Sequence, residues 1–408
     1  MINIVVKLDE KNLSSPEQIG ETAKRLIEEK KFGRNVVAVV PPTSLLNGSV
    51  EKIVHSLSDS PAEKELDVIH STNALVASSL LSIAIQKRGF RSQSLAGWQV
   101  GIKTTRKTSG YARIEDVNGD VIIERFKKGE IVIVAGGQGV DEENNITLLG
   151  EGGADTTAVA IGKSIGAERV EIYAELDGVY TGDPNVVQHA RKLKDITYDE
   201  MLELSYLGSK IVHPRAVELA KKFEMPLVVR SSTKNVRGTV IKGEIEMEKN
   251  LIVRGVAYET DIIRFTVGYE TLEKSSLANL FNTLAKHHVN VDIIVQSVME
   301  EVKPTISFSI AKEDLANAVK VLEDHKEELG FQFADFEVGL AKVSIVGSGM
   351  VSNPGVAAKM FARLCKENIP VKMVSTSEIK VSVVVPQDDM IRAANALHDE
   401  FGLAEELA

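Results

Sequence analysis

The sequence predicts an α/β domain with a mostly parallel sheet, followed by two ferredoxin-like modules. Three observations lead to this prediction. Short apolar runs alternate with helix-like stretches through the first half, a polar stretch follows near residue 245, and the second half repeats itself. The chain has 408 residues, which suggests about two to four domains.

The alternation in the first half defines the expected strands and helices. Continuous apolar runs indicate parallel strands buried on both faces; they cover Ile2–Val6, Asn35–Val40, Ile131–Ala135 and Val170–Ala174. Amphipathic helices are expected at Gln18–Lys30 and Leu75–Gln86. The last strands are expected at Pro226–Arg230 and Gly238–Ile241, and the polar stretch Lys242–Asn250 is interpreted as a linker. This order is typical of an α/β domain.

The second half contains an internal repeat. The segments "LFNTLAKHHVNVDIIVQS" and "MFARLCKENIPVKMVSTS" align at an offset of 80 residues, since Phe281 matches Phe361 and Leu284 matches Leu364. Further along, "TISFSI" matches "KVSVVV". Each copy has the order strand, helix, strand, strand, helix, which is a ferredoxin-like pattern. Two such copies usually pair their sheets side by side.

Charge and cysteine content exclude several classes of protein. The net charge is −10 and no basic block is present, which argues against nucleic-acid and anionic-membrane partners because their phosphates need a positive surface. Cys365 is the only cysteine, so no intrachain disulfide is possible. The N-terminus does not resemble a signal peptide, and no apolar run is judged long enough to span a membrane. A cytoplasmic protein is expected.

Two segments carry candidate phosphate-binding chemistry. The run "LGEGGADTTAVAIG" places Gly152, Gly153 and Asp155 where a turn enters a helix, and a helix N-terminus attracts anions. The structural alternative is a plain turn in which Asp155 caps the helix. The first predicted strand ends in Lys7, but "LDEKN" follows it without the glycines that a phosphate loop needs.

Three further features each have a functional and a structural explanation. The loop "YAELDGVYTGDP" could hold a nucleotide base against Tyr180, but taken alone an ordinary hairpin with a Gly-Asp-Pro turn explains it better. Lys210 and Arg215 suit phosphates or carboxylate partners. His213 is interpreted as a structural donor. Because adjacent residues of a helix point apart, His287 and His288 predict no zinc site, and no metal site is predicted elsewhere.

These segments together resemble the aspartokinases over essentially the whole chain. The matching motifs of the first half are "GWQVGIKT", "GGADTTAVA", "DGVYTGDP", "YDEMLELSYLGSKIVHPRAVE" and "PLVVRSS". Those of the second half are "LIVRGVAYE", "VSIVGSGMVSNPGVAAKMF" and "KMVSTSEIKVSVVV". The pattern is most similar to lysine-sensitive aspartokinases with two ACT modules per chain. The resemblance implies an amino-acid-kinase fold over residues 1–245 and ACT modules over 246–335 and 336–408.

The resemblance also implies an activity and its residues. Members of the family transfer the γ-phosphoryl group of ATP to the side-chain carboxylate of aspartate, the first step toward lysine, threonine and methionine. The implied catalytic residues are Lys7, Asp155 and Lys210. The implied nucleotide-binding residues are Lys7, Ala174, Glu175, Tyr180, Asp183 and Lys210. The implied substrate-binding positions are Ala74, Glu151, Gly152, Gly153 and Ala154. ATP with Mg²⁺ is the expected cofactor set of an active enzyme, and none is expected of an inactive one.

Several of these positions depart from the family pattern. Leu8–Asn12 replace the glycine-rich run after the lysine, Ala74 replaces a glutamate, Glu151 replaces an arginine, and Ala174-Glu175 replaces Thr-Asp. Exchanging Arg for Glu turns attraction into repulsion, by roughly 4 kcal/mol for charges ~4 Å apart near a surface. Asp9 and Glu10 are expected to add repulsion to the phosphates. The departures therefore favour a catalytically impaired, amino-acid-sensing homologue. The alternatives are a working aspartate kinase under lysine or threonine feedback, and a kinase for another small carboxylic acid.

The regulatory half matches the family best. The implied effector-binding residues are Asp292, Gln296, Gly349, Met350, Val356, Ser375, Thr376 and Glu378. Lysine, threonine or both are the expected effectors, bound between the ACT modules of two chains. A homo-oligomer through these modules is expected, or a hetero-oligomer with an active aspartokinase. Pro304 departs from the usual glycine and is expected to reshape the effector loop. Met247 is a possible internal start of a shorter subunit.

Overall fold

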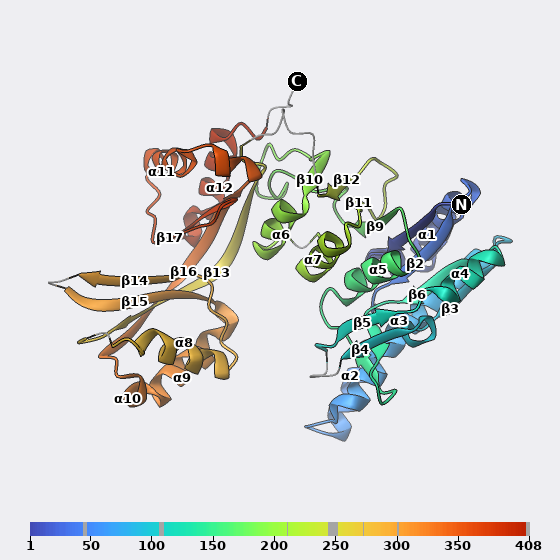
Figure 1. The fold of residues 1–408 in the computed structure, drawn as a ribbon, viewed down its shortest axis with the longest axis horizontal. Coiled ribbons are helices and arrows are strands. Elements are labelled where there is room, and N and C mark those ends of the chain that lie inside the picture. Colours follow the sequence, from blue (N-terminus) through green and yellow to red (C-terminus); the bar gives the residue numbers. More distant parts are fainter. Residues whose placement is uncertain are drawn as a thin grey trace. The chain divides into compact units, whose positions relative to one another are not determined.

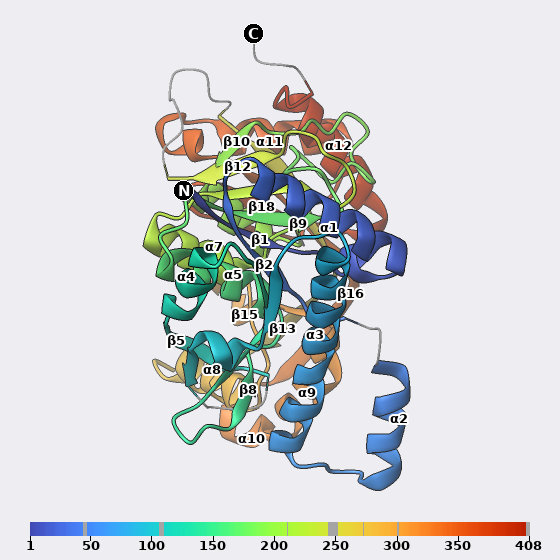
Figure 2. The same cartoon turned by 90° about the vertical axis from the view of Figure 1, so that its right-hand side faces the viewer.

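The chain folds into two compact units in the computed structural model (Figures 1 and 2). The structure describes residues 1–43, 47–105, 110–209, 211–243, 252–271, 273–299 and 302–404. The first unit, called the kinase unit below, comprises Met1–Val179 and Lys192–Glu246. The second, called the ACT unit, comprises Tyr180–Arg191 and Met247–Ala408. The possible start at Met247 lies outside the described residues.

The kinase unit alternates strands and helices. Its strands are β1 (Asn3–Lys7), β2 (Asn35–Val40), β3 (Ser92–Leu95), β4 (Ile102–Thr105), β5 (Arg113–Val117), β6 (Ile131–Ala135), β7 (Gln138–Val140), β8 (Ile146–Leu148), β9 (Arg169–Ala174), β10 (Asp195–Thr197), β11 (Leu227–Ser231) and β12 (Thr239–Lys242). Its helices are α1 (Pro16–Lys31), α2 (Asn47–Leu57), α3 (Glu63–Gln86), α4 (Asp120–Lys127), α5 (Gly153–Ser164), α6 (Tyr198–Tyr206) and α7 (Pro214–Phe223). Two short 3₁₀ helices are η1 (Glu10–Leu13) and η2 (Gly97–Val100). The strands expected from the apolar runs are confirmed.

Eight strands form the main sheet in the order β10-β12-β11-β9-β1-β2-β6-β3. All neighbours are parallel except β11 and β12. Val5 of β1 lies opposite Val37 of β2 and Val170 of β9, and all three are fully buried. Burial on both faces explains why the central strands have continuous apolar sequences. A second sheet has the order β5-β4-β7-β8.

Helices cover both faces of the main sheet. On one face, apolar residues of α1 and α3 form a core with β1, β2 and β6, and Figure 2 shows the two helices side by side. On the other face α5 and α7 pack together, and a Cβ added at Gly162 would lie 2.9 Å from Val170. Ser15 caps α1 by accepting the N–H of Gln18, and Pro16 begins the helix.

Helix α3 bears on the expectation that no apolar run is long enough to span a membrane. Among the described residues it is the one helix that is long and apolar enough to cross a membrane by length and composition. Its buried residues pack against α1 and the sheet, as expected of a core helix in a globular domain.

The strand order creates a switch point between β1 and β9. From β1 the chain proceeds to β2 and β6 on one side, whereas β9, β11 and β12 lie on the other side. In open α/β sheets the crevice at the carboxyl ends of such strands is the usual place for a ligand. Lys7 ends β1 and Ala174 ends β9, so both residues lie where such a sheet usually binds a ligand.

The ACT unit contains one six-stranded sheet in the order β14-β15-β13-β16-β18-β17. Its strands are β13 (Gly255–Gly268), β14 (Ile294–Met299), β15 (Val302–Ala311), β16 (Phe333–Val346), β17 (Met373–Thr376) and β18 (Lys380–Pro386). Its helices are α8 (Ser276–Lys286), α9 (Leu315–Asp324), α10 (Lys326–Leu329), α11 (Val356–Lys366) and α12 (Met390–Glu400). The 3₁₀ helices are η4 (Lys312–Asp314), η5 (Ser348–Ser352) and η6 (Gln387–Asp389).

The internal repeat becomes two ferredoxin-like modules that share their longest strands. Helices α8 and α11 occupy equivalent positions, and Leu284 and Leu364 are fully buried in separate cores. The second half of β13 pairs with β15, whereas its first half pairs only with the second half of β16. Each module therefore uses part of β13 and part of β16, and the predicted fold class is confirmed.

Candidate active site and effector-binding edges

An ion pair joins Lys7 and Asp155 at the switch point. Lys7 Nζ lies 2.8 Å from Asp155 Oδ1, and both side chains are largely buried, with 15% and 8% exposed. The second carboxylate oxygen, Oδ2, accepts the backbone N–H of His213 at 3.1 Å. Lys7 ends β1 and Asp155 lies in the first turn of α5, so two residues 148 positions apart meet. The third implied catalytic residue, Lys210, lies outside the described residues.

The glycines before α5 are required by the packing around them. Gly152 has a φ of +67°, and a Cβ there would lie 2.0 Å from the His213 ring. A Cβ on Gly153 would lie 2.8 Å from Leu149. These contacts explain both glycines structurally, and the turn still places a helix N-terminus beside Lys7 and Asp155. Glu151 is exposed just before this turn, and Ala154 is buried within it.

The segment after Lys7 forms a capped 3₁₀ turn. The Asp9 carboxylate accepts the N–H of Lys11 at 2.9 Å, and the Asn12 side chain accepts the N–H of Asp9 at 2.9 Å. This is a reciprocal capping box, which holds the chain closed without glycine. The Asp9 carboxylate therefore caps the turn, and the simple repulsion expected of it is reduced by this bond.

A second ion pair lies at the end of β9. Lys11 Nζ is 2.6 Å from Glu175 Oε1, with both side chains exposed. The hydrogen bond that Lys11 donates to Glu175 raises the pKa of Lys11, so Lys11 stays charged at neutral pH. The carboxylate that replaces the family's aspartate is thus partly balanced by a lysine that the family pattern lacks. Ala174, the neighbouring position, ends the strand and is buried.

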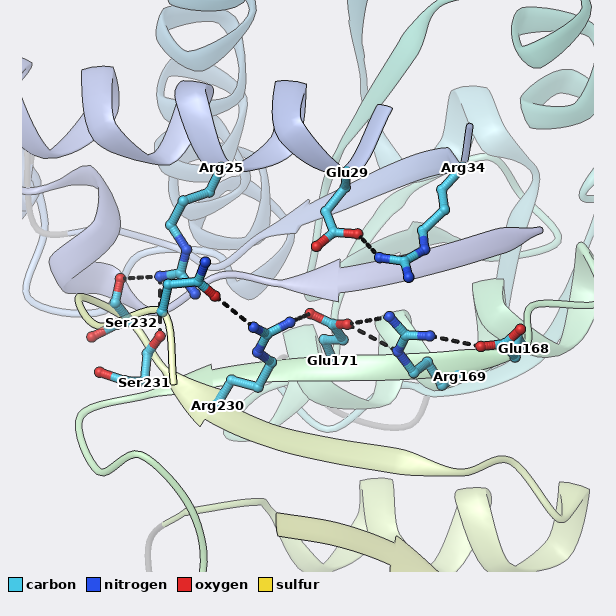
Figure 3. Close-up of polar contacts among 10 residues, drawn as sticks. Arg25, Glu29, Arg34, Glu168, Arg169, Glu171, Arg230, Ser231 and Ser232 are labelled. Carbon is cyan, nitrogen blue, oxygen red and sulfur yellow. Dashed lines mark hydrogen bonds and ion pairs between the residues drawn. The ribbon is translucent and has the colours of Figure 1, made fainter. Parts of the chain in front are cut away.

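The structure adds residues that the sequence reasoning missed. Asn12 Nδ2 donates to the carbonyl of Ser232 at 2.8 Å, and Ser232 N–H donates to the carbonyl of Ala174 at 2.7 Å. Arg25 of α1 donates to the carbonyls of Ser231 and Ser232, as Figure 3 shows. The motif "PLVVRSS" was the available signal, because it places two serines at the end of a predicted strand.

Tyr180 and Asp183 belong to the ACT unit. In that unit the Tyr258 hydroxyl donates to Asp183 at 2.8 Å, and Val256 N–H donates to the carbonyl of Thr181 at 2.8 Å. Burial first, and then the Asp183 carboxylate, raise the pKa of Tyr258 to about 12. The structure therefore groups these two implied nucleotide residues with the regulatory half of the chain. Their role in nucleotide binding stays a prediction.

Arg215 and His213 have structural roles. Arg215 donates to the carbonyls of Leu149 at 2.7 Å and Ala112 at 3.1 Å, and its role toward phosphates or carboxylates stays a prediction. His213 caps α7, because its Nδ1 accepts the N–H of Arg215 at 3.3 Å. The sequence predicted a structural donor, whereas the ring nitrogen accepts this bond and the backbone N–H is the donor, to Asp155. Ala74, at the replaced glutamate position, is buried in α3.

Asp292 is already paired inside the ACT unit. The Lys342 ammonium lies 2.5 Å from Asp292 Oδ2 and 2.7 Å from Glu259 Oε2. Burial alone would lower the pKa of Lys342, but its hydrogen bonds to Asp292 and Glu259 outweigh this effect and raise it. Two carboxylates around one ammonium leave one negative charge in excess. The cluster can therefore still attract an amino-acid ammonium group.

The other implied effector residues lie at two edges and one turn of the ACT sheet. Gln296 lies on β14, at one edge of the sheet, whereas Ser375 and Thr376 lie on β17 at the opposite edge. Glu378 is exposed in the turn after β17. After β16, Gly349 and Met350 lie in the 3₁₀ helix η5, and Val356 begins α11. Pro304 lies within β15, where its carbonyl accepts the N–H of Tyr269.

These edges do not meet within one chain. Strands β14 and β17 are separated by the four inner strands of the sheet. A single effector cannot contact both edges of one flat sheet, because neighbouring strands lie about 4.8 Å apart. A second copy of the chain would be required to bring both sets of residues to one ligand. Within the part of the chain described here, no group of three or more His, Cys, Asp or Glu side chains is placed to hold a metal ion.

Comparison with known proteins defines the class. The amino acid kinase family matches residues 3–231, and an ACT domain matches residues 276–325 and 343–401. The fold and the family matches therefore define a member of the amino acid kinase family that also carries ACT domains.

The relatives define the family more closely. The chain is 49% identical over 402 residues to aspartokinase 2 of Bacillus subtilis (strain 168), covering 98% of each chain. It is 46% identical over 407 residues to the aspartokinase of Geobacillus stearothermophilus, covering 99% of this chain and 98% of the relative. The structure of E. coli aspartokinase III in complex with aspartate and ADP is similar in fold, with a TM-score of 0.78 at 20% identity over 97% of this chain and 99% of that one. The chain belongs to the aspartokinase family.

Proposed function

We propose that the chain is a working aspartate kinase, which transfers the γ-phosphoryl group of ATP to the side-chain carboxylate of aspartate. The observation that carries this proposal is the 49% identity to a named aspartokinase over 98% of both chains. The Lys7–Asp155 pair at the switch point supports it. The relatives favour this alternative over the catalytic impairment that the altered motifs predict.

The charges of the site suit phosphoryl transfer, whose catalysis is mostly positioning and charge stabilisation. Lys7 supplies a largely buried ammonium, and Asp155 holds it in place while accepting the His213 N–H. The N-terminus of α5 lies in the same turn as Asp155 and favours negative charge. Mg²⁺ would be bound chiefly through the phosphates of ATP, since the described residues contain no dedicated carboxylate cluster for it.

Two contacts reduce the repulsion that acidic residues near the site would exert on the phosphates of ATP. The Asp9 carboxylate caps a 3₁₀ turn, and the Glu175 carboxylate pairs with Lys11. Neither carboxylate is therefore a bare charge directed at a phosphate. Glu151 is exposed, where water screens its charge from an incoming carboxylate.

A second candidate is an amino-acid-sensing homologue with little kinase activity. Glu151 in place of an arginine, and the absence of glycine between Lys7 and Leu13, are the specific observations that favour it. The two candidates differ in one variant. Glu151→Arg should lower the KM for aspartate, by about tenfold or less for an exposed charge, if the enzyme works. It should leave an inactive chain inactive, because catalytic groups that act as a unit are not restored singly.

The ACT unit is assigned the regulatory role. Lysine, threonine or both are the proposed effectors, held between two copies of the chain by the opposite edges of the ACT sheet described above. The proposed assembly is a homo-oligomer in the cytoplasm. A mixed oligomer with another aspartokinase is the alternative assembly. Thermal scans with lysine, threonine and methionine, each at ~10 mM, test the effector. At a hundred-fold excess over Kd the stabilisation is about 2.7 kcal/mol, whereas no shift with any of them removes the assignment.

The deciding experiment for the reaction is a coupled ADP-release assay with Mg-ATP. L-Aspartate is compared with a panel of small carboxylic acids at the same concentration. We expect release that depends on aspartate and exceeds that with any other acid. Release with a different acid would move the assignment to that substrate. No acid-dependent release would favour the sensing homologue.

A further inference from the structure

Arg25 holds the loop that follows β11. Its Nη1 donates to the carbonyl of Ser231 at 3.0 Å and to that of Ser232 at 2.7 Å. Its guanidinium lies over the ring of Tyr173, 4.1 Å from the ring centroid. Figure 3 shows the side chain reaching from α1 toward these two carbonyls. One arginine thus connects a helix on the sheet surface to the carboxyl ends of two strands.

The two carbonyls belong to buried residues at the start of a turn. Ser231 and Ser232 are 2% and 4% exposed. The Ser231 hydroxyl accepts the N–H groups of Thr233 and Lys234, at 3.2 Å and 3.0 Å. Ser232 O also accepts from Asn12, the residue that closes the turn after Lys7. The loop is therefore tied to the end of β1 as well as to α1.

The strand before this loop is fixed by a buried charge. Glu171 of β9 pairs with Arg230 of β11 and with Arg169, as Figure 3 shows. Arg230 also donates to Asn235 at 2.8 Å, just beyond the turn. Arg25 therefore holds the start of the loop Ser231–Asn235, and Arg230 holds its end.

The loop lies on the β9 side of the switch point. Ser232 N–H donates to the carbonyl of Ala174, and Ala174-Glu175 is the position that the family resemblance assigns to the nucleotide. The implied aspartate positions, in contrast, lie on α3 and in the turn before α5. Thr233 and Lys234 are exposed at the tip of the loop, on the ligand side of a parallel sheet.

We propose that Arg25 is a positioning residue for nucleotide binding: it fixes the loop Ser231–Asn235 at the carboxyl ends of β9 and β11 without touching the substrate. This inference rests on the proposed kinase function. An arginine suits the role because its planar fork reaches two carbonyls and stacks on an aromatic ring at once. A lysine keeps the charge but cannot hold both carbonyls in one fixed geometry.

The test compares Arg25→Lys with the control Arg34→Lys. Arg34 is also a half-buried arginine, and it pairs with Glu29 of the same helix, but it precedes β2 at the amino end of the sheet. We expect Arg25→Lys to raise the KM for ATP about tenfold, as for the loss of one hydrogen bond to a charged donor. The KM for aspartate should not change, and Arg34→Lys should change neither value. A purely structural role would not separate the two substrates.

A binding measurement separates this inference from the proposed function. Calorimetry with ADP on the full chain should show about tenfold weaker binding for Arg25→Lys and no change for Arg34→Lys. If the wild-type chain binds ADP but releases none from ATP and aspartate, the proposed function fails while this difference upholds the role of Arg25. Equal ADP affinity in wild type and Arg25→Lys overturns the inference, as does a wild-type chain that binds no nucleotide.

Discussion

In both units of the molecule a buried charged group lies between two partners of opposite sign, and the two arrangements differ. In the kinase unit Glu171 lies between Arg169 and Arg230. In the ACT unit Lys342 lies between Glu259 and Asp292. The two arginines are each 19% exposed, whereas the two carboxylates are 35% and 50% exposed. The first cluster is closed to solvent and the second is open.

The difference matches what each unit is proposed to do. A closed cluster holds strands β9 and β11 in fixed register below the candidate nucleotide loop. An open cluster with one excess negative charge can exchange partners with an amino-acid ammonium group. The buried carboxylate of Glu171 is therefore associated with fixed strand geometry. The half-exposed carboxylates of Glu259 and Asp292 are associated with reversible binding.

Breaking the closed cluster should have the largest effect. Glu171→Gln removes the buried anion shared by two largely buried guanidinium groups, although Arg169 keeps Glu168 as a partner. The expected cost is about 3–5 kcal/mol of unfolding free energy. Urea denaturation followed by circular dichroism measures it. A loss below about 1 kcal/mol would show that water compensates the arginines, and the description of the cluster as closed would be wrong.

Breaking the open cluster should cost less. Lys342→Met removes the cation but leaves two carboxylates that water can reach, so the expected loss is about 1–2 kcal/mol. Added L-lysine should recover part of the lost melting temperature in this variant, because its ammonium can take the vacated position. Lysine should not rescue Glu171→Gln, which serves as the matched control. Equal rescue of both variants, or of neither, would contradict the comparison.

His398 is a buried side chain of the ACT unit with one hydrogen-bond partner among the described residues. Its Nε2 lies 2.8 Å from the Thr181 hydroxyl, and its Nδ1 has no hydrogen-bond partner within the described structure. Burial first, with His189 and Arg191 adding to it against the opposing effect of Asp399, lowers the pKa of His398 below 6.5. The unfolded chain then binds a proton more readily than the folded one. Stability should therefore fall as the pH decreases below about 6.5, by at most about 1.4 kcal/mol per pH unit.

The variant His398→Gln isolates this effect. It should flatten the dependence of the melting temperature between pH 7 and pH 5 relative to wild type, because glutamine does not titrate. The same slope in both proteins would assign the pH dependence to other groups.

The surface pair of the site should have the smallest effect. Lys11 and Glu175 are both exposed, and exposed ion pairs contribute little to stability. Lys11→Met should therefore leave the melting temperature unchanged within error. A clear drop would place Lys11 among the structural residues of the turn after Lys7.

The fold could be predicted because it depends on local patterns. The apolar runs of β1, β2, β6 and β9 are buried on both faces, and the repeated motifs of α8 and α11 mark two similar modules. The roles of Lys7 and Asp155 were expected only from the family resemblance, and the ion pair between them was not predicted.

The remaining features depend on contacts that no local pattern records. Arg25 and Asn12 act on backbone carbonyls that lie 207 and 220 positions away, and a carbonyl has no sequence signature. The placement of Tyr180 and Asp183 was also hidden, because Val187 in the same segment is an ordinary apolar residue that proves to lie in the core of the second ACT module. Asp9 was expected to repel phosphate, but a short acidic side chain before a turn serves equally well as a cap.

The most direct test of the account compares Lys7→Met with wild type in aspartate-dependent ADP release. We expect a wild-type turnover of about 1 s⁻¹ or more, within the usual range of enzymes. We also expect a loss of about 100-fold or more in Lys7→Met, because the buried ammonium is the charge placed for the transferred group. A wild-type rate no higher than that of Lys7→Met would contradict the claim that this chain is a working aspartate kinase.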